Sequence, residues 1–144
     1  MIYKGLPECC REDFLHNIAD DDKLWLFDQL DALPSTIEAR RSAFRLYESE
    51  LSSKGFSAYP FQKGAVPWRY NILLNVDMKK KLVKQCLENG LPVSDWYPCV
   101  TELFDEQKDF PGAKKHEEMI LNFPLLIEEA QIKKICKIIN EVCL

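Results

Sequence analysis

The sequence predicts an α+β fold: a two-layer sandwich in which helices cover one face of a small, mostly antiparallel sheet, with further helices at the N-terminus. Three observations predict it. Segments with helical periodicity alternate with strand-like segments, the strands are short and few, and 144 residues can bury one hydrophobic core but not two. We therefore expect a single domain over residues 1–144, with an N-terminal helical segment at 1–33 and the sandwich at 34–144.

The N-terminal segment has helical spacing of apolar residues from Glu12 to Leu33, interrupted by the acidic triplet Asp20-Asp21-Asp22. Such a triplet is typical of a helix cap and a solvated turn between two helical pieces. A calcium loop is the alternative, but the triplet lacks the alternating oxygen ligands, the glycine and the terminal glutamate that such a loop needs.

A long amphipathic helix is predicted to follow, ending at about Ser53. Ser35 and Glu38 have the spacing of a capping box at its start. At its end, Lys54 and Gly55 supply a cation and a residue free to adopt a positive φ.

Two strands are expected after this helix. Phe56–Tyr59 alternates between apolar and polar residues as a short strand does. Val66–Leu74 is rich in β-branched and aromatic residues, and Pro67 lies near its start, where a missing N–H is tolerated.

Asp77 is predicted to cap a helix in which apolar residues repeat at helical spacing until Asn89-Gly90 ends it. Four lysines lie mostly opposite the apolar face of this helix: Lys79, Lys80, Lys81 and Lys84. A solvated basic face is favoured over an anion site for these lysines.

The C-terminal part is predicted to hold two strands and two helices. Leu91–Pro98 indicates a strand followed by a turn, Ala113–Met119 a short helix and Ile120–Phe123 a short strand. The last helix is expected over Ile127–Cys143, packed through one stripe of side chains: Ile132, Ile135, Ile139 and Val142.

Charge and hydropathy argue against two classes of partner. The net charge is −4, and no basic stripe is interleaved with aromatic residues, so nucleic acid is not an expected partner. The first residues hold no apolar leader, and apolar runs such as Phe123–Ile127 are far too short to cross a membrane. We expect a cytoplasmic protein without a membrane partner.

The six cysteines and two histidines do not have metal-ligand spacing, because no CxxC pair is present. We expect reduced cysteines that act as small buried hydrophobes, and no metal site. A Cys99–His116 dyad is a possible nucleophilic pair, against the alternative of a thiol in a turn and an imidazole on the surface. The five glycines are too scattered to form a phosphate-binding loop or a dinucleotide fingerprint.

Four segments, in this order, resemble the C-terminal small domain of the DegT/StrS family of sugar aminotransferases. They are Leu30–Leu33 followed by Ile37–Arg41, Tyr47 and Leu51; Val66–Leu74; Asn89–Pro98; and Phe110–Ala113 followed by Ile120–Leu125. The similarity runs from about Leu24 to the C-terminus. Cys99-Val100-Thr101 departs from the Pro-Leu-His that many members carry after the aromatic pair, which affects any substrate contact made by that loop.

The resemblance implies an aspartate-aminotransferase fold and an enzyme family that uses pyridoxal phosphate. In that family the Schiff-base lysine, its partner carboxylate and the phosphate cup belong to the large domain, so we expect no catalytic residue and no cofactor bound by this chain alone. The residues implied to line a substrate site are Arg69, Trp96, Tyr97 and Asn122.

Three hypotheses follow for function. The chain is a detached small domain of a sugar aminotransferase, a stand-alone module that binds a protein or ligand, or a small enzyme of unrelated mechanism. Under the first hypothesis, separation from the large domain leaves apolar side chains uncovered, and we expect a homo-oligomer or a separate large-domain partner. Those side chains are Trp25, Phe27 and Trp96.

Overall fold

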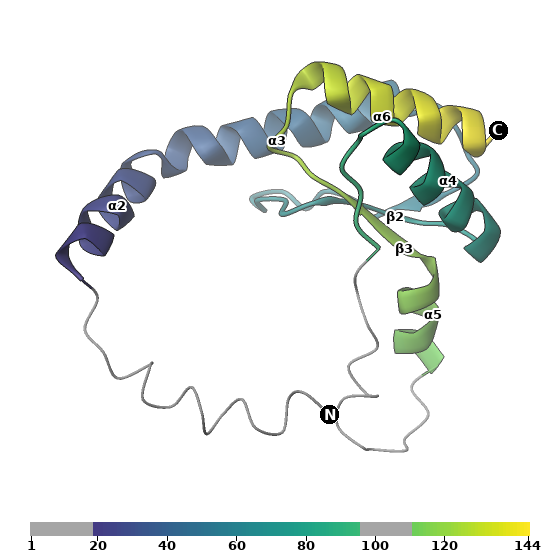
Figure 1. Ribbon diagram of the computed structural model, residues 1–144, viewed down its shortest axis with the longest axis horizontal. Helices are drawn as coiled ribbons and strands as arrows, with labels where there is room; N and C mark the ends of the chain where they lie inside the picture. The colour runs from purple at the N-terminus through teal and green to yellow at the C-terminus, as the bar shows by residue number, and fades with distance from the viewer. Residues whose placement is uncertain (1–18, 96–110) are drawn as a thin grey trace.

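The computed structural model describes residues 19–95 and 111–144 (Figure 1). In chain order the elements are α2 (Asp20–Asp31), α3 (Leu33–Glu50), β1 (Ser57–Ala58), β2 (Tyr70–Leu73), α4 (Val76–Glu88), α5 (Pro111–Met119), β3 (Ile120–Phe123) and α6 (Glu129–Val142). This is the predicted mixture of helices and a small antiparallel sheet, so the α+β fold class is confirmed.

The sheet has the order β1-β2-β3, and both pairings are antiparallel. In the register of β2 and β3, Tyr70 lies opposite Phe123 and Asn71 opposite Asn122. Side chains alternate between the two faces of a strand, so Tyr70 and Phe123 point to one face and the two asparagines to the other.

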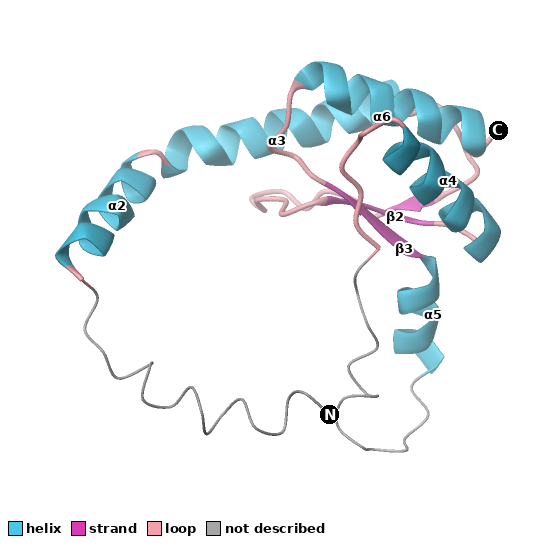
Figure 2. Ribbon diagram, in the orientation of Figure 1, coloured by secondary structure: helices cyan, strands magenta, loops and turns pink. Residues whose placement is uncertain are grey.

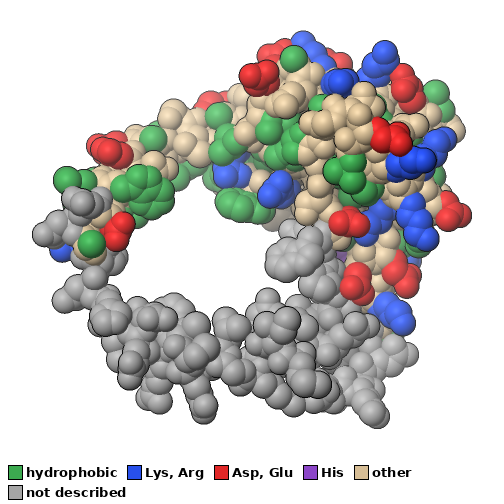
Figure 3. All heavy atoms as spheres, viewed as in Figure 1, with side chains coloured by type: hydrophobic (Ala, Val, Ile, Leu, Met, Phe, Trp, Pro, Cys, Tyr) green, Lys and Arg blue, Asp and Glu red, His purple; other side chains and the backbone are tan. Residues whose placement is uncertain are grey.

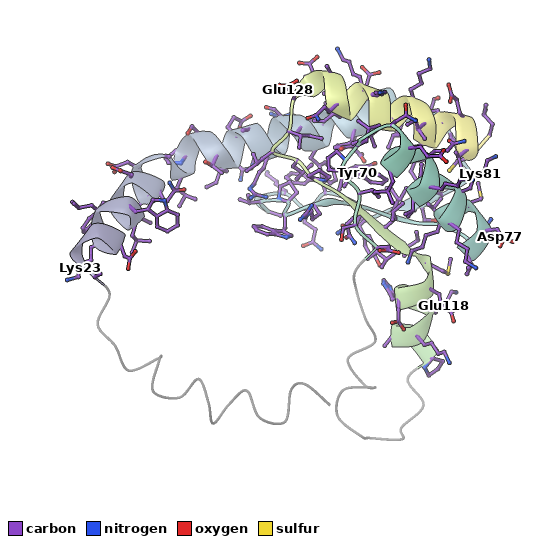
Figure 4. All side chains as sticks on the ribbon, in the orientation of Figure 1. Lys23, Tyr70, Asp77, Lys81, Glu118 and Glu128 are labelled. Atoms are coloured by element: carbon purple, nitrogen blue, oxygen red, sulfur yellow. The ribbon has the colours of Figure 1, made fainter. Side chains whose placement is uncertain are left out.

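Helices α3, α4 and α6 lie together on one side of the sheet (Figure 2). Their apolar residues meet the Tyr70 face of the sheet and form one core, in which the rings of Tyr47 and Tyr70 stack with centroids 4.7 Å apart. Figure 4 shows Tyr70 between the sheet and this helical layer. The Tyr47 hydroxyl donates to the Pro124 carbonyl at 3.1 Å, and that of Tyr70 donates to Glu48 at 2.8 Å, so both buried phenols are satisfied.

The predicted starts of α2 and α3 differ from the structure. The acidic triplet lies in the first turn of α2 instead of in a turn before it, and Ala19 precedes the helix without a side-chain cap. The predicted capping box of Ser35 and Glu38 is wrong, because Ala32 is the N-cap, Ser35 donates to the Ala32 carbonyl, and Glu38 pairs with Arg45.

The cap of α4 also differs from the prediction. Asn75, not Asp77, is the N-cap, and its side-chain oxygen accepts from the Met78 N–H at 2.8 Å. Gly90 has a positive φ, as expected for the residue that ends a helix. Lys79 is the exception to the solvated basic face, since it is buried and its Nζ donates to the Glu117 carbonyl at 2.9 Å.

The two predicted strands around Pro67 and Leu91 are shorter than expected. The segment Val66–Arg69 does not join the sheet, and β2 begins only at Tyr70. After α4, only Ser94 pairs with the sheet in the described residues, through an isolated antiparallel bridge to Asn122.

The end of α3 is held by α6. Helix α3 stops at Glu50, and Asn140 of α6 accepts from the Ser52 and Ser53 N–H groups while donating to the Glu50 carbonyl. Gly55 does not have the predicted positive φ. A side chain there would meet the Cys143 carbonyl oxygen, so the close approach of the backbone is what requires glycine.

Candidate functional site

Arg69, the first predicted site residue, lines a small cavity of about 170 Å³ beside the start of β2. The other residues that line it are Arg40, Trp68, Pro124, Leu125 and Leu126. Arg69 is half-buried, and no hydrogen bond or ion pair engages its guanidinium within the described ranges. Among its described lining residues the cavity therefore has two guanidinium groups, apolar walls and no carboxylate.

An arginine pair on α3 positions the loop that forms this cavity. Arg40 donates to the Trp68 carbonyl at 3.0 Å, and Arg41 donates to the Ala65 carbonyl at 3.3 Å. The Arg40 guanidinium carbon also lies 4.6 Å from the centroid of the Trp68 ring, a cation–π contact. These bonds explain why the segment before Tyr70 leaves the sheet: its carbonyls are directed to α3.

Asn122, the second predicted site residue, is 1% exposed in the middle of β3. Its backbone exchanges two hydrogen bonds with Ser94, and its side-chain Nδ2 donates to the Ser94 carbonyl at 3.1 Å. The Oδ1 atoms of Asn122 and of its cross-strand neighbour Asn71 are buried and accept no hydrogen bond from the described part of the chain. These amides face away from the helical layer, and sequence reasoning missed Asn71.

The four predicted site residues are only partly brought together. Arg69 lies at the end of the β2–β3 ladder where Pro124 lines the cavity, whereas Asn122 is further along the ladder and does not line it. Trp96 and Tyr97 lie outside the described residues, so their role stays a prediction. Arg40 and Trp68 are the residues that sequence reasoning did not connect, although the arginine pair was a visible signal.

The described thiols do not have the surroundings of nucleophiles. Cys86, Cys136 and Cys143 are free and buried, as expected for cysteines in a reduced core. Burial raises the pKa of Cys86 to about 11 and that of Cys136 to about 12, so both are neutral thiols near neutral pH.

The predicted Cys99–His116 dyad is not tested, because Cys99 lies outside the described ranges. His116 is exposed on α5, and its Nε2 lies 2.9 Å from the Tyr59 hydroxyl.

Among the described side chains, no three of His, Cys, Asp or Glu gather as a metal site would require. Within the same ranges, no helix has the length and apolar character that a bilayer crossing demands.

Helix α2 carries an uncovered apolar surface. Trp25 is 64% and Phe27 63% exposed, as expected, and three further side chains of the helix are also exposed: Leu24, Leu26 and Leu30. The helix extends away from the sandwich in Figure 1, and Figure 3 shows hydrophobic side chains on its visible face. Large exposed apolar patches are unusual on monomeric proteins.

Comparison with known proteins shows that this fold is similar to part of the fold of solved aminotransferases. Neither a scan of protein-family models nor a search of curated proteins finds a match. Among solved structures, the aminotransferase TlmJ from Streptoalloteichus hindustanus superposes with a TM-score of 0.72 and 17% identity over 79% of this chain. Spr1654 from Streptococcus pneumoniae is assigned as a sugar aminotransferase. Its PMP form superposes with a TM-score of 0.71 and 14% sequence identity over 81% of this chain.

The PLP form of the same Streptococcus pneumoniae protein gives a TM-score of 0.65 and 17% identity over 82% of this chain. The chain spans about one third of each of these proteins, 33% to 35% of their length. At these identities the likeness shows a shared fold.

The described lining of the cavity at Arg69 does not have the groups that hold pyridoxal phosphate. The cofactor needs a lysine for its aldehyde and free backbone amides for its phosphate. No lysine lines the cavity at Arg69, and the buried Lys79 is bonded to the Glu117 carbonyl. Two helix N-termini are occupied by side chains of the chain itself, Asn75 on α4 and Glu128 on α6.

Proposed function

We propose that this chain serves as the small domain of a DegT/StrS-type, pyridoxal-phosphate-dependent sugar aminotransferase and needs a separate large domain to supply the cofactor site. The observation that carries the proposal is the fold match to two aminotransferases, one of them assigned as a sugar aminotransferase, over 79% to 82% of this chain and about a third of theirs. Within this function, Arg69, Trp96 and Tyr97 line the substrate side that faces the large domain.

The uncovered surface of α2 supports a partner. A helix with exposed Trp25 and Phe27 at its centre gains by burial against another apolar surface, at roughly 25 cal/mol per Å² of apolar area. The large domain is the first candidate for that surface, and a second copy of the chain is the other. The protein is proposed to act in the cytoplasm.

Two measurements test the proposal. The gene's upstream sequence, or an adjacent gene, should encode a lysine-bearing large domain; a neighbourhood without one would contradict it. Purified chain mixed with pyridoxal phosphate and then reduced with borohydride should show no single labelled lysine in peptide mass spectrometry. Stoichiometric labelling of one lysine that a Lys→Arg substitution removes would show a cofactor site within the chain.

A stand-alone binding module is the second candidate. The same α2 surface supports it, because the surface can hold a partner that has no aminotransferase activity. Co-purification of the chain with its encoded large domain, lost in a Trp25→Ser/Phe27→Ser variant, supports the first function. A large domain that is fully active without the chain supports the second.

A further inference from the structure

We propose that the cavity at Arg69 binds the oxyanion group of a small molecule, a phosphate or a carboxylate. The described lining of the site comes from Arg40 in the interior of α3, from the loop before β2 and from the loop after β3. Because Arg69 also lies on the substrate side in the proposed function, the inference concerns that same side of the chain, but anion binding by this chain can be measured without a large domain.

The first step of the argument is charge. Arg40 and Arg69 line the same cavity, no carboxylate is among its described lining residues, and Arg69 has no hydrogen bond or ion pair within the described ranges. Two guanidinium groups at one cavity repel each other, and a bound anion relieves that repulsion. Arg45 on the same helix is different, because it is already paired with Glu38.

The second step is donor geometry. A guanidinium presents five N–H donors in a planar fork that matches the oxygens of a carboxylate or phosphate. Arg40 uses one donor on the Trp68 carbonyl, which fixes the side chain and leaves the others available. Within the described ranges, no N–H donor of the Arg69 guanidinium is used in a hydrogen bond. The site is thus partly preorganised before an anion arrives.

The third step is size and environment. A volume of about 170 Å³ holds several water molecules, at about 30 Å³ each, and so has room for one oxyanion but not for a large ligand. Pro124, Leu125 and Leu126 form apolar walls, and a low local dielectric strengthens charge-assisted hydrogen bonds. Trp68 is 68% exposed at the rim, with Arg40 against its ring, so it reports on binding directly.

The test is a titration of the 144-residue chain with inorganic phosphate and, separately, with acetate, at constant ionic strength set with chloride. The measured signals are the Trp68 indole N–H and the arginine Nε–H resonances in two-dimensional NMR spectra. We expect saturable shifts at Trp68 and Arg69 with at least one of the two anions, and the anion that saturates at lower concentration identifies the oxyanion class.

The variants decide the assignment. Arg69→Gln is expected to weaken binding at least tenfold, and Arg69→Lys, which keeps the charge but loses the fork, by a smaller factor. Arg45→Gln removes one positive charge from the same helix and should leave the affinity unchanged. If Arg69→Gln loses the dispersion of the folded spectrum, Arg69→Lys supplies the comparison. Shifts that do not saturate with either anion, or equal weakening by Arg45→Gln, would overturn the proposal.

Discussion

Helices α2 and α6 have similar lengths, 12 and 14 residues, but opposite surroundings. Helix α6 buries a stripe of apolar residues against α3 and α4, whereas α2 leaves its apolar residues exposed. The difference lies in spacing. The apolar residues of α6 recur three or four positions apart and occupy one face, while Leu24-Trp25-Leu26-Phe27 are consecutive and point all round the helix.

The two helices also differ in how they begin. The N-terminus of α6 has a complete capping box, in which Glu128 accepts from the N–H of Gln131 and the Gln131 side chain accepts from the N–H of Glu128. Figure 4 marks Glu128 at this end of the helix. Helix α2 has Ala19 in the same place and no side-chain cap. One neighbouring layer is enough to stabilise α6, whereas α2 needs contacts on more than one side.

The largest expected effect comes from truncating one apolar side chain in each helix. Ile139→Ala opens a cavity at a fully buried position of α6 and should lower the free energy of unfolding by about 2–5 kcal/mol. Phe27→Ala removes a larger side chain from α2, but this side chain is exposed, so the free energy of unfolding should change by less than about 0.5 kcal/mol. Urea unfolding followed by circular dichroism measures both. A loss above about 1 kcal/mol for Phe27→Ala would show that α2 is packed within the chain.

The second prediction concerns pH and the buried thiols near α6. The pKa of Cys86 rises from about 9 to about 11, and that of Cys136 to about 12, because burial disfavours the thiolate. The unfolded chain therefore releases these protons first. The neutral thiols contribute their full share to the free energy of unfolding below pH 9. This contribution is lost as the pH rises from about 9 toward 11 to 12, and the free energy of unfolding then falls by at most about 1.4 kcal/mol per pH unit for each thiol.

Urea unfolding at pH 8 and pH 10 measures this slope. Cys136→Ala should flatten it, because the variant has one fewer thiol to ionise in the unfolded chain. A substitution on α2, such as Trp25→Ser, is the control and should leave the slope unchanged. An equally steep slope in Cys136→Ala would assign the pH dependence to other groups.

The third prediction concerns the hydrogen bonds that join Asn140 of α6 to the end of α3. Asn140→Ala leaves the Ser52 and Ser53 N–H groups and the Glu50 carbonyl without their partner, and should destabilise the chain by about 1–3 kcal/mol. Asn89→Ala is the matched control, since its side chain bonds only to the Gln85 carbonyl within its own helix, and it should cost less than about 0.5 kcal/mol. Equal losses in the two variants would contradict a bridging role for Asn140.

Local pattern predicted most of the fold. The β3 strand, the α6 stripe and the stop at Gly90 depend on neighbouring residues, and the structure contains all three. The helix caps were wrong where two polar residues compete within a few positions, because the choice between Asn75 and Asp77 depends on where the first turn begins.

Contacts between distant segments could not be predicted from one sequence. Arg40 and Trp68 are 28 residues apart, and Asn140 lies 88 residues from Ser52. Arg69 was named because the resemblance to the aminotransferase family implied a substrate site at its strand-like segment. Its cavity could not be found, because the cavity exists only where the loop before β2 is bonded to α3.

The smallest expected effect on the free energy of unfolding comes from substitutions at the N-caps of α2 and α6. Glu128→Ala removes the cap of α6 and should lower the free energy of unfolding by about 0.5–2 kcal/mol, because the first turn of α6 is part of the cooperative core. Ala19→Ser adds a hydroxyl at a residue whose extended backbone, φ −61° and ψ 153°, suits an N-cap. Since α2 packs weakly on the rest of the chain, the added cap should stabilise α2 alone and not the folded core. Hydrogen exchange should show slower exchange of the α2 amides in Ala19→Ser, with the urea midpoint unchanged. A raised midpoint would mean that α2 unfolds together with the core, and that its exposed apolar residues do not belong to a separately fluctuating helix.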